Sequence, residues 1–183
     1  MDEPGRQGLF PRRARALPGV AMRQTPALSR SRFADASAAR QAVDRCLPLI
    51  EPALRDTAVS GLGVLHLVVL DPGLTPLDSG YEDAVLHERS IGDRAIWDVD
   101  YAAYAHAKAR LAWRHGCDSR RVLAAPHRLA EQDQLVWGGV WLDGIVVAAS
   151  GAMPAWDEAF SLAVAAQLRG IAYERARAAR ALD

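Results

Sequence analysis

LVWGGVWLDGIVVAAS, residues 135–150, is the stretch of sequence that decides the fold. Asp143-Gly144 separates two apolar segments, 135–142 and 145–150. An Asp-Gly pair readily adopts the positive φ angles that the central residues of a type I′ turn require. The stretch therefore predicts a β-hairpin, and Gly151 is expected to end its second strand.

A strand and a long helix are predicted on the two sides of this hairpin. Residues 64–70 form an apolar run rich in β-branched side chains, which is typical of a strand covered on both faces. Asp71-Pro72-Gly73 predicts a turn after that strand. Pro154 suits the first position of the final helix. The predicted buried stripe of this helix is Trp156, Phe160, Ala163, Val164 and Ile171.

The helix predicted over residues 101–115 carries a lysine on its apolar side. Asp98 or Asp100 can cap its N-terminus. At about 100° per residue, Lys108 falls within the apolar arc formed by Tyr101, Tyr104, Ala105, Leu111 and Ala112. Lys108 is the one lysine among 22 basic residues. We interpret it as a position that arginine would not serve.

The segments before this helix are more polar. Asp35 or Ser37 can begin a first helix, which Pro48 and Pro52 are expected to keep short or kinked. Residues 74–77 are expected to start a partner strand for 64–70. Residues 78–94 are polar and contain two glycines, which predicts a long loop or lid.

The order of the predicted elements decides the fold class. A helix, two strands, two helices, a hairpin and a final helix do not form a βαβ alternation. The order predicts an α+β domain, with a largely antiparallel sheet flanked by helices. We assign this domain to residues 33–183. Residues 1–32 are rich in arginine and have no periodic apolar face, so we interpret them as a disordered basic tail.

Charge and cysteine content argue against several classes of protein. The chain has 22 basic and 22 acidic residues, so nucleic-acid binding is not expected outside the tail. Cys46 and Cys117 lie far apart and lack the spacing of a zinc site, and the presence of two cysteines does not require a disulfide. No apolar run approaches the roughly 20 residues of a membrane span, and no secretory signal is readable. A cytoplasmic location without membrane contact is expected.

Several short motifs, taken in order and spacing, resemble those of one protein family. They are residues 68–71 followed by Gly73, then Lys108-Ala109, Gly138-Gly139, residues 143–147, Ser150-Gly151 and Asp157-Glu158. Together they resemble the GlcG/HbpS family, which also occurs as the C-terminal domain of PduO-type adenosyltransferases. The resemblance implies a profilin-like antiparallel sheet of about five strands, assembly into homo-oligomers, and haem binding in several members. Relative to that family, residues 78–99 would include an insertion beside the pocket.

The candidate ligand-binding residues are Lys108, Gly138, Gly139, Ser150, Gly151 and Asp157. Lys108 could hold the carboxylate of a haem propionate or a small organic acid, or it could form an internal salt bridge with Asp157 or Asp71. The two strand glycines would admit the close approach of a ligand or of another stretch of backbone, or they would mark a bulge in a curved sheet. Ser150-Gly151 precedes a helix whose first amides attract anions.

The chain has five histidines that could in principle bind haem iron. His127 and His87 are the candidates for an axial ligand, because both are expected in loops near the cleft. His66 lies in a predicted strand and is interpreted as a core residue with satisfied hydrogen bonds.

Three functions remain open from the sequence. The first is a haem or tetrapyrrole-binding protein that serves storage, sensing or redox protection. The second is an enzyme or accessory subunit that acts on a small organic acid held by Lys108. The third is an oligomeric interaction protein with a vestigial pocket. No common catalytic motif is present to choose among them.

Overall fold

The computed structural model of the protein describes residues 30–181. They form an α+β fold with one sheet of four antiparallel strands in the order β2-β1-β4-β3. The elements in chain order are α1 (Ala36–Ala53), β1 (Leu65–Leu70), α2 (Tyr81–Ala84), β2 (Val85–Ile91), η1 (Arg94–Ile96), α3 (Tyr101–His115), α4 (Ser119–Leu123), η2 (Pro126–Arg128), β3 (Gly139–Leu142), β4 (Ile145–Ser150) and α5 (Pro154–Arg180).

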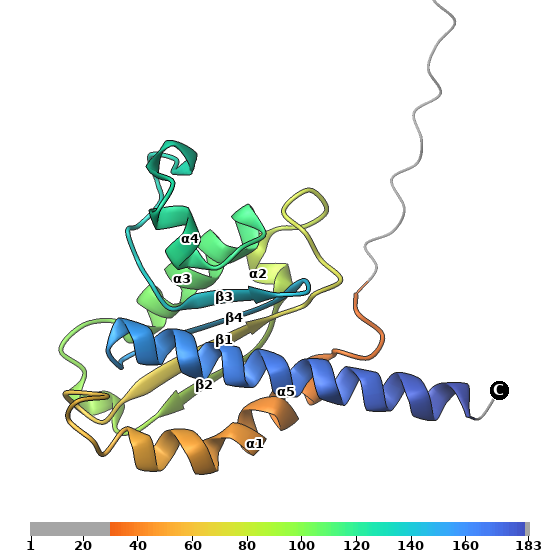
Figure 1. The fold of residues 1–183 in the computed structure, drawn as a ribbon, viewed down its shortest axis with the longest axis horizontal. Coiled ribbons are helices and arrows are strands. Elements are labelled where there is room, and N and C mark those ends of the chain that lie inside the picture. The colour runs from red at the N-terminus through yellow and green to blue at the C-terminus, as the bar shows by residue number, and fades with distance from the viewer. Residues whose placement is uncertain (1–29, 182–183) are drawn as a thin grey trace, which may run out of the picture.

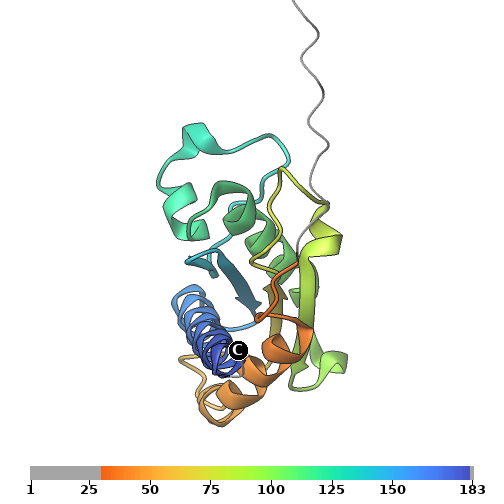
Figure 2. The same ribbon diagram turned by 90° about the vertical axis from the view of Figure 1, so that its right-hand side faces the viewer.

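Helices cover both faces of the sheet (Figures 1 and 2). α1 and α5 lie side by side on one face, and α3 packs on the other. Alternate residues of β1 divide between the two faces, as the two-residue period of a strand requires. Leu67 and Val69 join the core under α1 and α5, whereas Val68 and Leu70 join the core under α3. The strand is buried on both sides, as residues 64–70 predicted.

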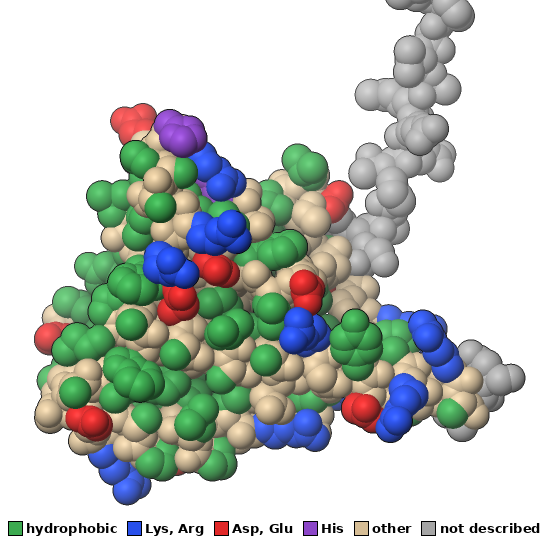
Figure 3. All heavy atoms as spheres, viewed as in Figure 1, with side chains coloured by type: hydrophobic (Ala, Val, Ile, Leu, Met, Phe, Trp, Pro, Cys, Tyr) green, Lys and Arg blue, Asp and Glu red, His purple; other side chains and the backbone are tan. Residues whose placement is uncertain are grey.

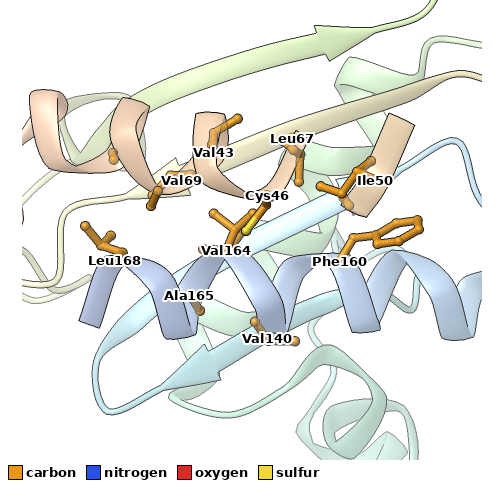
Figure 4. Packing of buried hydrophobic residues seen from close by; sticks show 14 of the residues in the cluster. Val43, Cys46, Ile50, Leu67, Val69, Val140, Phe160, Val164, Ala165 and Leu168 are labelled. Atoms are coloured by element: carbon orange, nitrogen blue, oxygen red, sulfur yellow. The ribbon is translucent and has the colours of Figure 1, made fainter. Parts of the chain in front are cut away.

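The larger core lies between the sheet and the pair formed by α1 and α5. Figure 4 shows Val43 and Ile50 of α1 close to Phe160 and Val164 of α5. The prediction for α5 is wrong at Trp156, which is 44% exposed. Its neighbour Asp157 is buried instead, and the 100° rotation between the two residues turns Trp156 away from the core.

The hairpin has the predicted turn. Asp143 and Gly144 have φ angles of 51° and 90°, both in the positive range of a type I′ turn. The first strand is shorter than predicted and begins at Gly139, because Gly138 has a φ of 125° and leaves the extended conformation. The helix predicted after Asp98 or Asp100 is confirmed as α3, with Asp100 as its N-cap. The second of the two predicted helices is α4, which follows Asp118.

β2 is the main correction to the sequence-based prediction. Residues 74–77 were expected to begin the partner of β1, but they contain no strand. The partner is β2, which lies inside the predicted loop 78–94 and pairs with β1 from Ile91 to Val85. β2 is an edge strand, and its middle residues are polar on both sides. The apolar alternation that identifies a half-buried strand is therefore missing.

α1 also differs from the prediction. Asp35 is its N-cap, as proposed, and accepts a hydrogen bond from the Ala38 amide. The helix nevertheless continues through Pro48 and Pro52 to Ala53, so it is not short. A proline inside a helix removes one backbone hydrogen bond. Burial of the face that carries Val43 and Ile50 offsets this loss.

Four strands, rather than about five, are present within residues 30–181. Most of the predicted basic tail, residues 1–29, lies outside the described part of the chain. None of the helices in that part is both long and apolar enough to cross a membrane.

Candidate functional site

The lysine of α3 meets the start of α5 in the protein interior. Lys108 Nζ donates to Asp157 Oδ2 at 2.6 Å, to the Ala149 carbonyl at 2.9 Å and to Ser150 Oγ at 3.2 Å. Both charged side chains are almost fully buried. These three acceptors match the three N–H groups of an ammonium. The salt-bridge interpretation of Lys108 is therefore confirmed, with Asp157 rather than Asp71 as the partner.

Burial dominates the electrostatics of this pair. It raises the pKa of Asp157 to about 6, although Lys108 and the Ala152 amide both favour the ionised carboxylate. Burial also lowers the pKa of Lys108, against the opposing effect of Asp157. The pair holds together two groups that would each be costly to bury alone.

The two glycines at the start of β3 allow α3 and α5 to approach the sheet closely. A Cβ atom on Gly139 would collide with the Lys108 carbonyl, and one on Gly138 would lie 2.7 Å from the Asp157 Cβ. The Ser119 hydroxyl accepts hydrogen bonds from both glycine amides. Of the alternatives left open for these glycines, the structure shows the close approach of other segments of the protein.

Ser150 and Gly151 belong to the same internal junction. Ser150 is buried and contacts Lys108, and a Cβ atom on Gly151 would overlap the Val64 carbonyl. Asp157 Oδ1 accepts a hydrogen bond from the Ala152 amide just before α5. The six predicted ligand-binding residues therefore come together, and their contacts join α3, the hairpin and α5 to one another.

The two predicted axial histidines lie on different parts of the fold. His127 is exposed in η2. His87 was expected in a loop, but it lies in β2 opposite Val69, on the face toward α1. The structure does not bring these two histidines to one site.

A different group of side chains comes together between β1, β2 and α3. His66 Nε2 and His106 Nε2 each lie 3.3 Å from the same atom, Glu88 Oε2. The three atoms all lie within 4.8 Å of one another, close enough to hold one metal ion. β1 supplies His66, β2 supplies Glu88 and α3 supplies His106. Three elements distant in sequence therefore build this cluster, which we call the His–Glu–His cluster.

Each imidazole is held by a hydroxyl on its other nitrogen. His66 Nδ1 lies 2.9 Å from Ser90 Oγ, and His106 Nδ1 lies 2.9 Å from the Tyr81 hydroxyl. The Tyr81 hydroxyl also donates to the His106 carbonyl, which leaves its oxygen lone pairs able to accept the Nδ1 proton. These partners direct both Nε2 atoms toward Glu88.

Aromatic residues from the β2–α3 connection and from the start of α3 close one side of the cluster. The Trp97 ring meets the His66 ring edge-on at 6.0 Å between centroids, and Tyr101 packs against Trp97 at 5.5 Å. Burial lowers the pKa of His66, and the nearby Glu88 carboxylate acts in the opposite direction. A neutral imidazole is the form that can donate a lone pair to a metal.

The cluster is buried at one end and open at the other. The His66 side chain is 5% exposed, whereas those of His106 and Glu88 are 23% and 42% exposed. The prediction that His66 is a core residue with satisfied hydrogen bonds is confirmed, since both of its ring nitrogens have partners. Sequence reasoning missed the cluster because Glu88 and Ser90 lie in the segment taken for a loop.

None of the three comparisons, with protein-family models, with curated proteins and with solved structures, finds a match to this chain. The resemblance to the GlcG/HbpS family stays a prediction.

Proposed function

We propose that this protein binds one divalent transition-metal ion through His66, Glu88 and His106. The observation that carries the proposal is the shared approach of two imidazole Nε2 atoms to one carboxylate oxygen at 3.3 Å. Ligands at about 2.1 Å from one metal are separated by roughly 3.0 to 3.4 Å in octahedral or tetrahedral geometry. The two nitrogen–oxygen distances already match that separation.

The chemistry of the donor set supports a transition metal. Two imidazoles and one carboxylate suit Zn²⁺ or Fe²⁺, whereas Ca²⁺ and Mg²⁺ prefer oxygen ligands throughout. The three donor atoms are electron-rich and can approach one another in two ways: protons on the ring nitrogens can form hydrogen bonds to the carboxylate, or a metal ion can take the place of those protons. The negative charge of the carboxylate favours a cation at this place.

The surroundings of the cluster support the same proposal. Histidines that bind metals usually donate their second ring proton to an oxygen, which orients the ring and raises its basicity. Ser90 and Tyr81 provide such an oxygen for His66 and His106. Three protein ligands leave coordination positions unfilled, and the exposure of Glu88 directs them to solvent. The site is suited to binding a further small molecule on the metal.

Titration with Co²⁺, followed by visible absorption and by calorimetry, tests the proposal. One equivalent is expected to bind the wild-type protein. Glu88→Gln and His106→Gln are expected to weaken binding at least tenfold, because each removes one of three ligands. His87→Gln is the matched control, since His87 is adjacent to Glu88 on β2 but belongs to the opposite face. Circular dichroism would confirm that each variant is folded.

Two results would overturn the metal proposal. One is a wild-type protein that binds no Co²⁺, Zn²⁺ or Fe²⁺ at micromolar concentrations. The other is a loss of binding in His87→Gln as large as that in Glu88→Gln, which would place the metal elsewhere.

The other functions suggested by the sequence stay predictions. Haem binding through His127 or His87 would produce a shift in the Soret band on titration with haem.

Homo-oligomer formation is supported by exposed apolar side chains near the start of α5 and the end of α1. Figure 3 shows hydrophobic side chains gathered in this region. The large ones are Leu49, Met153, Trp156 and Leu162. Light scattering would measure the assembly.

An enzyme or accessory subunit that acts on a small organic acid was the second function suggested by the sequence. An organic-acid site at Lys108 would require the ligand to displace Asp157 from the lysine.

A further inference from the structure

We infer that the open positions of this metal bind a small oxyanion, and that Arg94 holds the other end of that anion. The inference rests on the proposed metal site and names the class of ligand that the site takes. Arg94 belongs to η1, in the short connection between the strand that carries Glu88 and the helix that carries His106. The same connection carries Trp97, whose ring packs against that of His66.

Arg94 is held on an aromatic surface that packs against the cluster. Its guanidinium carbon lies 4.7 Å from the centroid of the Trp97 ring, and the Trp97 ring meets His66 at 6.0 Å. A guanidinium stacked on an aromatic face keeps its N–H edge available for hydrogen bonds. Within residues 30–181, Arg94 makes no ion pair and its side chain makes no hydrogen bond. Its donors remain for an acceptor from outside the protein.

The backbone of the connection is ordered by its own hydrogen bonds. The Asp93 carboxylate accepts from the Ala95 amide at 2.8 Å, and the Trp97 amide donates to the Arg94 carbonyl at 3.3 Å. Trp97 offers a second observation of the same kind, because its indole N–H is buried and has no acceptor in the described part of the chain. Two neighbouring side chains thus carry donors without a protein acceptor.

The positive charge of the metal-loaded cluster and of Arg94 favours an anionic ligand. A divalent metal bound by one carboxylate and two neutral imidazoles keeps a net charge of one plus, and Arg94 adds a second positive charge. An oxyanion that places one oxygen on the metal and another on the guanidinium neutralises both. Carboxylates and phosphates share this chemistry, since each offers two oxygens in a geometry that arginine binds in a bidentate manner.

The experiment uses the Co²⁺-loaded protein and two probes, oxalate and inorganic phosphate. Each anion is titrated while the visible absorption of Co²⁺ is followed, because an anion that ligates the metal changes its spectrum. The wild-type protein is expected to respond to at least one probe at submillimolar concentration, and the probe that binds more tightly identifies the class. Arg94→Gln is expected to weaken that binding about tenfold, the loss of roughly one charge-assisted hydrogen bond. The affinity for Co²⁺ itself should not change.

Arg89→Gln is the matched control. Arg89 follows Glu88 on β2, but it pairs with Leu67 on the face toward α1 and α5. Equal anion affinity in the wild type and Arg94→Gln would overturn the inference. A loss of anion affinity in Arg89→Gln as large as that in Arg94→Gln would also overturn it, because it would indicate a general effect of charge. A Co²⁺ spectrum that neither anion alters would also overturn it. Failure of Co²⁺ to bind at all would instead reject the proposed metal site, so the two failures are distinguishable.

Discussion

Lys108 Nζ and Asp157 Oδ2 lie 2.6 Å apart in a position that joins α3 to the first turn of α5. The ammonium has three acceptors, and the carboxylate is held on its other oxygen by the Ala152 amide. Neither side chain contributes to a surface, so the pair acts on the stability of the fold. Removal of either partner leaves the other buried without a counter-charge.

Lys108→Met is expected to lower the free energy of unfolding by about 3 to 5 kcal/mol, the cost of leaving an unpaired buried charge. Lys108→Met combined with Asp157→Asn should cost less than Lys108→Met alone. The asparagine oxygen can still accept from Ala152, and its amide can donate to the acceptors that the lysine leaves. Urea denaturation of the wild type, both single variants and the double variant would measure the coupling. Strictly additive losses would show that the two residues do not act as a pair.

The pH dependence of Lys108→Met follows from the pKa of Asp157. Burial raises this pKa to about 6 even beside Lys108, and removal of the lysine raises it further. The folded state of the variant then binds a proton more tightly than the unfolded state, in which the carboxyl has its ordinary pKa of about 3.8. Stability from this proton is fully present below that value and is lost as the pH rises from there through the raised pKa, which in the variant lies above 6.

The deficit of Lys108→Met relative to the wild type should therefore be larger at pH 8 than at pH 5. Denaturation in urea at the two pH values would measure both deficits. The Lys108→Met, Asp157→Asn double variant is the control, because it lacks the carboxyl that titrates. A deficit that is the same at both pH values would contradict the assignment of the effect to Asp157.

Two glycine substitutions should change stability in opposite directions. Gly139→Ala is expected to destabilise the protein by about 1 to 3 kcal/mol, because the new methyl group would collide with the backbone of α3 at Lys108. Gly170→Ala lies within α5, where nothing is found within 4 Å of the added Cβ, and should stabilise by about 0.5 to 1 kcal/mol. Thermal unfolding of the two variants measures both signs. A stabilised Gly139→Ala would show that the glycine does not serve helix–sheet contact.

The parts of the fold that sequence reasoning recovered are those with local signals. The Asp143-Gly144 turn requires positive φ angles that few residue pairs adopt, and the rotational position of Lys108 on α3 follows from helical geometry. β2 has no such signal. It is an edge strand with polar residues, and its pairing with β1 depends on contacts made only after folding. Because β2 carries Glu88, the lack of a local signal for this strand also left the His–Glu–His cluster unpredicted.

The candidate site shows the limit of reasoning from single residues. Lys108 was correctly singled out as a buried amine, and its pairing with Asp157 was one of three alternatives, beside Asp71 and the carboxylate of a ligand. His66 was correctly placed in the core. Its approach to Glu88 and His106 depends on the register of β1 with β2 and on the position of α3 across them, which no local pattern specifies. The register between distant strands therefore decides whether a buried histidine also lies beside other possible metal ligands.

Tyr81→Phe tests whether the hydroxyl next to His106 Nδ1 supports the proposed metal site. The substitution keeps the ring, which packs against Trp113 at 5.8 Å, and removes the hydroxyl that lies 2.9 Å from His106 Nδ1. Loss of a hydrogen bond to the second nitrogen of a metal-bound histidine lowers metal affinity by roughly 10- to 100-fold. The affinity for Co²⁺ should decrease by a factor within that range, while the thermal midpoint should change little.

Tyr104→Phe is the control, because Tyr104 lies on the same helix as His106 and is 41% exposed. An unchanged Co²⁺ affinity in Tyr81→Phe would mean that the hydroxyl does not orient His106 for a metal, and would weaken the proposal at the ligand that α3 supplies.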